Sequence, residues 1–87
     1  MSKREKLYQR LHRVPPPKDF TWEELLTLMR RFGFEESCDG GSHYIFECGD
    51  TGYRFSMSKT HPSGILKKYQ VEAAKEAIAA VTEHRRE

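Results

Sequence analysis

Apolar residues recur along the chain with a helical period near both ends and with a period of two between them. The segment "DFTWEELLTLMRRFGF" places one apolar stripe on a helix, formed by Trp22, Leu25, Leu28, Met29 and Phe32. Thr21 can cap this helix, Glu24 can return the hydrogen bond, and Phe20 lies at the spacing of a hydrophobic staple to Leu25. Gly33 follows where a left-handed residue ends a helix. We therefore predict a helix that buries this stripe on a sheet.

Three short extended runs come next, at residues 34–38, 42–48 and 53–58, separated by the turn segments "DGG" and "GDTG". The residues that alternate onto one apolar face are Tyr44, Phe46 and Cys48 in the second run and Tyr53, Phe55 and Met57 in the third. His43, Ile45 and Glu47 then point to the opposite face. This pattern predicts a three-stranded antiparallel meander with one apolar side.

Helices are predicted at both ends of the chain. The segment "KYQVEAAKEAIAAVTEH" carries an apolar stripe of Val71, Ala74, Ile78 and Val81. Near the start, Ser2 and Glu5 fit a capping box, and the apolar positions that follow are Leu7, Leu11 and Val14. This first helix should end before "VPPPKD", because proline removes a backbone donor. We expect an N-terminal extension and Pro-rich linker at 1–18 and a domain at 19–87, and the pattern leaves open whether the extension is packed or mobile.

The predicted order is therefore α-α-β-β-β-α, an α+β class. Its α-β-β-β-α part looks like the double-stranded RNA-binding domain, a fold that binds RNA through phosphates and 2′-hydroxyls. The first helix is an addition to that fold. A chain of 87 residues has room for one small core, which excludes a large cofactor-binding architecture.

The total charge of the chain says little about its partners. Lys and Arg number 15 against 13 for Asp and Glu, so the net charge of +2 does not by itself indicate a polyanionic partner. Basic residues concentrate at 3–13 and 59–68, and solvated helix faces would explain them equally well. Because no signal peptide or apolar run of about 18 residues is present, we expect a cytoplasmic protein without membrane contact. Cys38 and Cys48 are then expected to be reduced thiols.

Two of the four histidines lie in segments where chemistry is plausible. Imidazole, with an unperturbed pKa of about 6.5, can act as acid or base near neutral pH. His43 follows three small residues in "GGSH", which leave room for a ligand, and His61 follows the third strand in "KTHPSG". If the middle hairpin pairs in register, His43, Lys59 and His61 share one end of the sheet. The alternative is that these are ordinary hairpin-end residues, as His12 and His84 are expected to be ordinary surface residues.

The spacing of the side chains argues against a zinc site and against a nucleotide site. Cys38, His43, Cys48 and His61 are possible ligands, but the chain has no C-x₂-C pair, and His43 and Cys48 face opposite sides of one strand. "GDTG" and "DGG" lack the strand-glycine-helix context of a phosphate loop. We therefore predict no metal and no cofactor.

Three spaced segments, "PKDFTWEELLTLMRRFGFEE", "GGSHYIF" and "HPSGILKKYQVEAAKEAI", resemble the HicA (YcfA-like) family of mRNA interferase toxins of type II toxin–antitoxin systems. The similarity runs from about Lys3 to Val81. The family pattern falls on Gly33 and Phe34, on Gly41, Ser42 and His43, and on Lys67 to Gln70. The resemblance implies a metal-independent endoribonuclease in which His43 is catalytic and which a HicB-type antitoxin protein inhibits.

In such an enzyme the imidazole of His43 would take the proton of an RNA 2′-hydroxyl, which DNA lacks, so we expect an mRNA substrate and no DNA contact by the toxin alone. General base catalysis of this kind contributes about 10² to 10⁴ in rate. The expected substrate-binding residues are Gly41, Ser42, Lys59, His61, Lys67 and Lys68. Whether His61 or a lysine assists His43 stays open. The alternatives are a non-catalytic RNA-binding module and a surface that binds only a partner protein.

Overall fold

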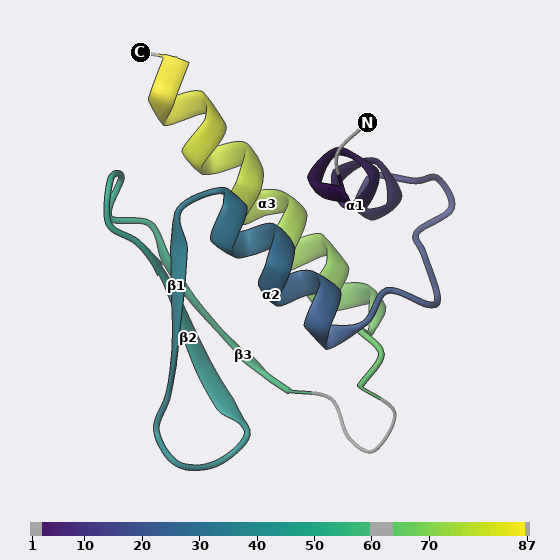
Figure 1. Cartoon of the computed structure of the whole chain (residues 1–87), viewed down its shortest axis with the longest axis horizontal. Helices are drawn as coiled ribbons and strands as arrows, with labels where there is room; N and C mark the ends of the chain where they lie inside the picture. Colours follow the sequence, from purple (N-terminus) through teal and green to yellow (C-terminus); the bar gives the residue numbers. More distant parts are fainter. Residues whose placement is uncertain (1–2, 60–63, 87) are drawn as a thin grey trace.

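The structure is a computed structural model that describes residues 3–59 and 64–86. Over these ranges the elements follow the predicted α-α-β-β-β-α order (Figure 1). They are α1 (Lys3–Leu11), α2 (Trp22–Arg31), β1 (Phe34–Cys38), β2 (His43–Cys48), β3 (Arg54–Ser58) and α3 (Lys68–Arg86). The α+β class is therefore confirmed. Among the described helices, none combines the length and the apolar character that a membrane crossing needs.

The strands form the predicted antiparallel meander, with β2 between β1 and β3. Phe46 of β2 pairs with Glu36 on one side and with Phe55 on the other. At the ends of β2, His43 pairs with Ser58 and Glu47 pairs with Arg54. Strands β2 and β3 each begin one residue later than predicted. This register brings the first residue of β2 beside the last residue of β3.

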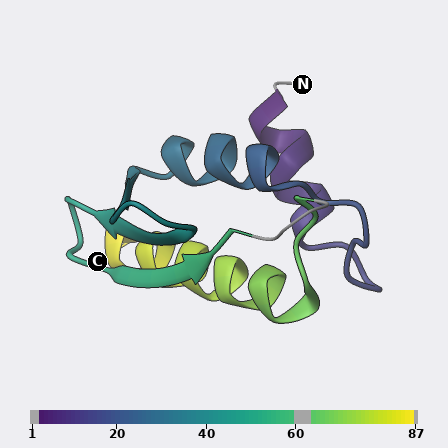
Figure 2. The same cartoon turned by 90° about the horizontal axis from the view of Figure 1, so that it is seen from below.

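Helices α2 and α3 lie side by side on the same side of the sheet (Figures 1 and 2). The predicted apolar face is the one they cover: Phe46, Cys48 and Met57 are buried. Phe46 stacks on Phe55 with ring centroids 4.9 Å apart, and Phe34 meets Phe55 edge-on at 5.7 Å. The opposite face, which carries His43, has no helix over it in the described part of the chain.

Local cues fix α2 as predicted. The Thr21 hydroxyl accepts a hydrogen bond from the Glu24 backbone N–H at 3.2 Å, and the Glu24 carboxylate accepts one from the Thr21 N–H at 3.0 Å. Phe32 is the C-cap of the helix, and Gly33, which follows it, has φ of 93°. Phe20 and Leu25, the two halves of the staple, are both fully buried. Capping box, staple and glycine stop therefore all act where the sequence places them.

The N-terminal extension is packed. Leu7 and Leu11 of α1 are buried in the same core as α2 and the sheet. Arg10 pairs with Glu24, and its guanidinium lies 5.2 Å from the ring centre of Phe20. The prediction that Val14 continues the apolar stripe is wrong, since α1 ends at Leu11 and Val14 is 89% exposed. The predicted cap at Ser2 lies outside the described residues.

Candidate active site

His43 is the first residue of β2, and its side chain is exposed on the face of the sheet that the helices leave open. Its backbone neighbour across the sheet is Ser58, and the Lys59 N–H donates to the Ser42 carbonyl at 2.8 Å. His43 and Lys59 therefore share one end of the sheet, as the register predicted. His61 lies outside the described residues.

The turn before His43 is open. Gly40 has φ of 103°, which a residue with a side chain rarely adopts, and no atom would come within 4 Å of a Cβ at Gly40 or Gly41. The Cys38 thiol donates to the Gly41 carbonyl at 2.8 Å and so closes this turn from the β1 side. Gly41 and Ser42 are exposed. The turn that precedes His43 therefore leaves open space at Gly40 and Gly41.

Lys59 and His43 leave this end of the sheet in different directions. Neighbouring residues of a strand face opposite sides of the sheet. Ser58 pairs with His43 and shares its outer face, so Lys59, the next residue, points to the side of the helices. Lys59 is accordingly half-buried, whereas His43 is exposed. A substrate that contacts both side chains must therefore pass around the end of the sheet.

A fully buried glutamine joins this end of the sheet to α3. The Gln70 amide donates to the Ser58 carbonyl at 2.8 Å, and its oxygen accepts the Lys67 backbone N–H at 2.8 Å. Because Ser58 pairs with His43, the start of α3 is tied directly to the strand beside the histidine. Lys67 and Lys68 thus lie at the same end of the molecule as His43. The sequence analysis included Gln70 only as the end of the family pattern and did not predict its buried role, although its position four residues before Ala74 on the apolar stripe was a usable signal.

Further backbone bonds hold the segment that leads into α3. The Trp22 N–H donates to the Gly64 carbonyl at 2.7 Å, and the Leu66 N–H donates to the Phe20 carbonyl at 2.8 Å. The start of α2 therefore fixes residues 64–66 from the other side. Together with Gln70, these bonds leave little freedom for the backbone of Lys67.

Two arginines elsewhere on the protein, Arg10 and Arg30, are neutralised by carboxylates. Arg30 binds Glu36 through two of its nitrogens, and hydrogen bonds from Arg30 lower the pKa of Glu36 against the opposing effect of burial. Arg10 pairs with Glu24 and, at 3.3 Å, with Asp19. These arginines stabilise the fold and have little charge to offer a ligand.

The lysines around the start of α3 differ from those arginines. With the described residues, Lys59, Lys67 and Lys68 form no ion pair. Lys18, which the sequence reading did not single out, lines a small hollow together with Leu66 and Lys68. Several lysines without an ion pair to described residues therefore lie near the end of the sheet that carries His43.

Tyr44 points away from the imidazole that precedes it. Its ring lies against Trp22, with centroids 5.2 Å apart, and is half-buried as predicted. Repulsion by negative charge on the neighbouring Cys38 sulfur, more than burial, raises the pKa of Tyr44. Tyr44 therefore stays a neutral packing residue at neutral pH, and the exposed side chain at this position of the hairpin is His43.

The two cysteines are free thiols, Cys38 exposed and Cys48 buried. Within residues 3–59 and 64–86, no three side chains of His, Cys, Asp or Glu come close enough to hold a metal ion. What the described site offers is one exposed imidazole with several unpaired lysines at the same end of the fold. That combination suits proton transfer beside an anionic group.

Comparisons of this chain with known protein families, with characterised proteins and with solved structures found no match. The similarity to HicA toxins therefore stays a prediction from three sequence segments. The position of His43 relative to Lys59 and α3 is the independent basis for a functional proposal.

Proposed function

We propose that this protein is a metal-independent endoribonuclease of the HicA type, with His43 as general base. The observation that carries the proposal is the exposed His43 beside an open glycine turn, at the end of the sheet where unpaired lysines gather. An imidazole can accept a proton near neutral pH, and lysines attract phosphates. An RNA strand is the ligand that needs both.

The reaction uses the substrate's own nucleophile. His43 takes the proton of a 2′-hydroxyl, and the freed oxygen attacks the adjacent phosphorus, forming a new P–O2′ bond. The P–O5′ bond breaks, and the departing 5′-oxygen takes a proton. The products are a 2′,3′-cyclic phosphate and a 5′-hydroxyl, so neither water nor a metal ion is required for the cleavage step.

Two further roles complete the proposed chemistry. Lys59 or Lys67 stabilises the negative charge that builds on the phosphate oxygens, an electrostatic contribution that is large in a site with fixed donors. His61 or one of the lysines gives the proton to the leaving 5′-oxygen. Gly41, Ser42 and Lys68 contact the backbone of the strand on either side of the cleaved bond.

We also propose a HicB-type antitoxin as the protein partner. A toxin must be kept inactive while it is made, and an inhibitor that covers the open face of the sheet would cover His43. The resemblance to HicA supports this partner, and the exposed outer face of the sheet is compatible with it.

The test is cleavage of a 5′-labelled single-stranded RNA by purified protein in EDTA. Wild type is expected to cut, and His43→Ala to lose at least about 100-fold in rate, the lower range for a missing general base. His84→Ala is the matched control, because His84 is an exposed histidine on α3, and it should cut like wild type. Circular dichroism confirms that both variants fold. Equal cleavage by wild type and His43→Ala would overturn the proposal.

A non-catalytic RNA-binding module is the second candidate. The unpaired lysines favour it equally, since they need no reactive group beside them. It predicts RNA binding without cleavage by wild type, and a His43→Ala variant that differs only in affinity. The same assay, read by both cleavage and gel shift, separates the two candidates.

A further inference from the structure

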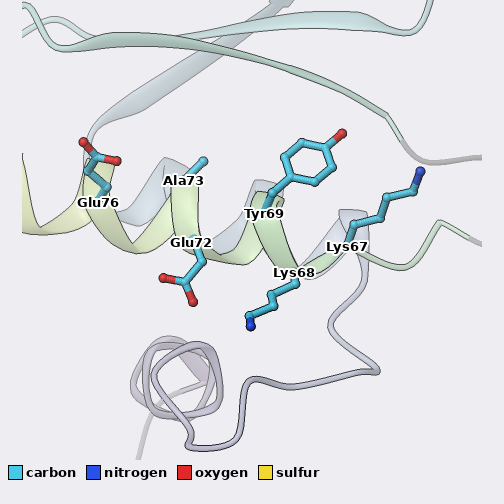
Figure 3. Close-up of a pocket in the computed structure, with 6 residues that line it drawn as sticks. All are labelled: Lys67, Lys68, Tyr69, Glu72, Ala73 and Glu76. Atoms are coloured by element: carbon cyan, nitrogen blue, oxygen red, sulfur yellow. The ribbon is translucent and has the colours of Figure 1, made fainter.

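A shallow groove of about 690 Å³ runs along the first turns of α3, lined by Lys67, Lys68, Tyr69, Glu72, Ala73 and Glu76. Figure 3 shows Lys67, Tyr69, Ala73 and Glu76 projecting to one side of the helix, and Lys68 and Glu72 to the other. The groove is wide open to solvent, unlike the enclosed clefts that bury most of a small molecule. A ligand in it would therefore lie along the helix with one side exposed.

Tyr69 is the aromatic residue of this groove, and it is 64% exposed. The large aromatic side chains of the core, such as Phe46 and Trp22, are buried. Ala73 lies one turn after Tyr69 on the same side of the helix and has only a methyl group. No long side chain at this position therefore covers the tyrosine ring. An exposed ring beside a small apolar residue is a suitable platform for a flat aromatic ligand.

The charged residues at the two ends of the groove would orient that ligand. Lys67 and Lys68 flank Tyr69 at the start of the groove, and they form no ion pair with described residues. At the far end Glu72 is paired with Lys75 at 3.3 Å, while Glu76 offers a carboxylate that can accept a hydrogen bond from a base amino group. A phosphate is thus attracted to one end and repelled from the other.

The groove begins near the proposed catalytic end of the sheet. Gln70, adjacent to Tyr69, donates to the carbonyl of Ser58, which pairs with His43. An RNA strand that passes around this end of the sheet from His43 therefore meets Lys67 and then Tyr69. A single RNA strand would thus contact both His43 and the groove beside Tyr69.

We propose that this groove is a base-stacking subsite for a single-stranded RNA, in which the Tyr69 ring stacks on a nucleobase flanking the cleaved bond and Lys67 and Lys68 hold the adjoining phosphates. The subsite rests on the proposed ribonuclease function for its position relative to the cut. It selects single strands, because bases inside a duplex already stack on their neighbours and offer no free face.

The test measures binding in the full-length His43→Ala protein, so that no cleavage interferes. The probe is a fluorescein-labelled single-stranded RNA of mixed sequence, followed by anisotropy, with a duplex of the same sequence as the second probe. Adding Tyr69→Ala is expected to weaken single-strand binding by about 5- to 100-fold, the range for one lost base stack. Tyr69→Phe keeps the ring and should stay within about twofold, and duplex binding should not depend on Tyr69.

The outcomes separate this subsite from the nuclease proposal. Unchanged single-strand affinity in Tyr69→Ala, or an equal loss in Tyr69→Phe, would overturn the subsite and leave the cleavage assay unaffected. Tyr69-dependent binding without cleavage by wild type would support the subsite and overturn the nuclease. If wild type binds no RNA at all, both proposals are wrong.

Discussion

The buried amide of Gln70 predicts a clear loss of stability when it is replaced by methionine. Methionine is similar in length and favours helices, so Gln70→Met leaves little cavity and no backbone strain. It removes both hydrogen bonds, and thus leaves the Lys67 N–H and the Ser58 carbonyl without their partner. The change therefore isolates the contribution of the amide.

The size of the effect follows from these two bonds. Ser58 and Lys67 are exposed residues, so water can partly replace the amide, and each bond is worth the usual net value of about 0.5–1.5 kcal/mol, or about 1–3 kcal/mol for the two. Small domains have a free energy of unfolding of about 5–15 kcal/mol in all. Gln70→Met should therefore lower the urea midpoint clearly.

Urea unfolding followed by circular dichroism measures this change. Glu72→Gln is the matched control, because Glu72 is exposed on the same helix, and it should stay within about 0.5 kcal/mol of wild type. If Gln70→Met also stays within that limit, the amide does not join α3 to β3 as described. The positioning of Lys67 beside the end of the sheet would then lose its basis.

Three other changes test the fold. Leu11→Ala should lower the free energy of unfolding by about 2–5 kcal/mol in a urea titration, because Leu11 is fully buried, and a loss below about 1 kcal/mol would mean that α1 is not part of the core. Thr21→Ala removes the cap of α2 and should cost about 0.5–2 kcal/mol by the same measurement, with exposed Thr27→Ala as the control. Burial opposes ionisation of Glu24, yet hydrogen bonds from Arg10 and Thr21 lower its pKa below the usual 4.5, so its stabilising effect is present above pH 4.5 and is lost as the pH falls further. Glu24→Gln should therefore show a shallower loss of stability in acid than wild type, and an unchanged acid dependence would contradict the pairing with Arg10.

Elements specified by neighbouring residues could be predicted from the sequence. The cap, staple and stop of α2 involve residues a few positions apart, so Thr21, Glu24 and Gly33 were sufficient to place it. The expectation that His43 and Lys59 share one end of the sheet also rested on local signals, namely a short turn and a register that keeps the apolar face together.

Contacts between distant segments could not be predicted in this way. The bonds of Gln70 to Ser58 and of Arg10 to Glu24 join residues 12 and 14 positions apart. Local patterns carry no information about which distant partner a polar side chain will find. The groove beside Tyr69 is different, because every residue that lines it lies between Lys67 and Glu76.

Attack by the 2′-hydroxyl is the central chemical claim, and one substituted RNA tests it most directly. Once the cut site in a short RNA is known, the nucleotide on the 5′ side of the cleaved bond is replaced by its 2′-deoxy form, and a copy with the substitution two nucleotides away serves as the control. We expect wild type to cut the control, leaving a 2′,3′-cyclic phosphate, and not to cut the first RNA at that bond. Cleavage of both RNAs at the same bond and rate would contradict the mechanism and the role of His43 in it.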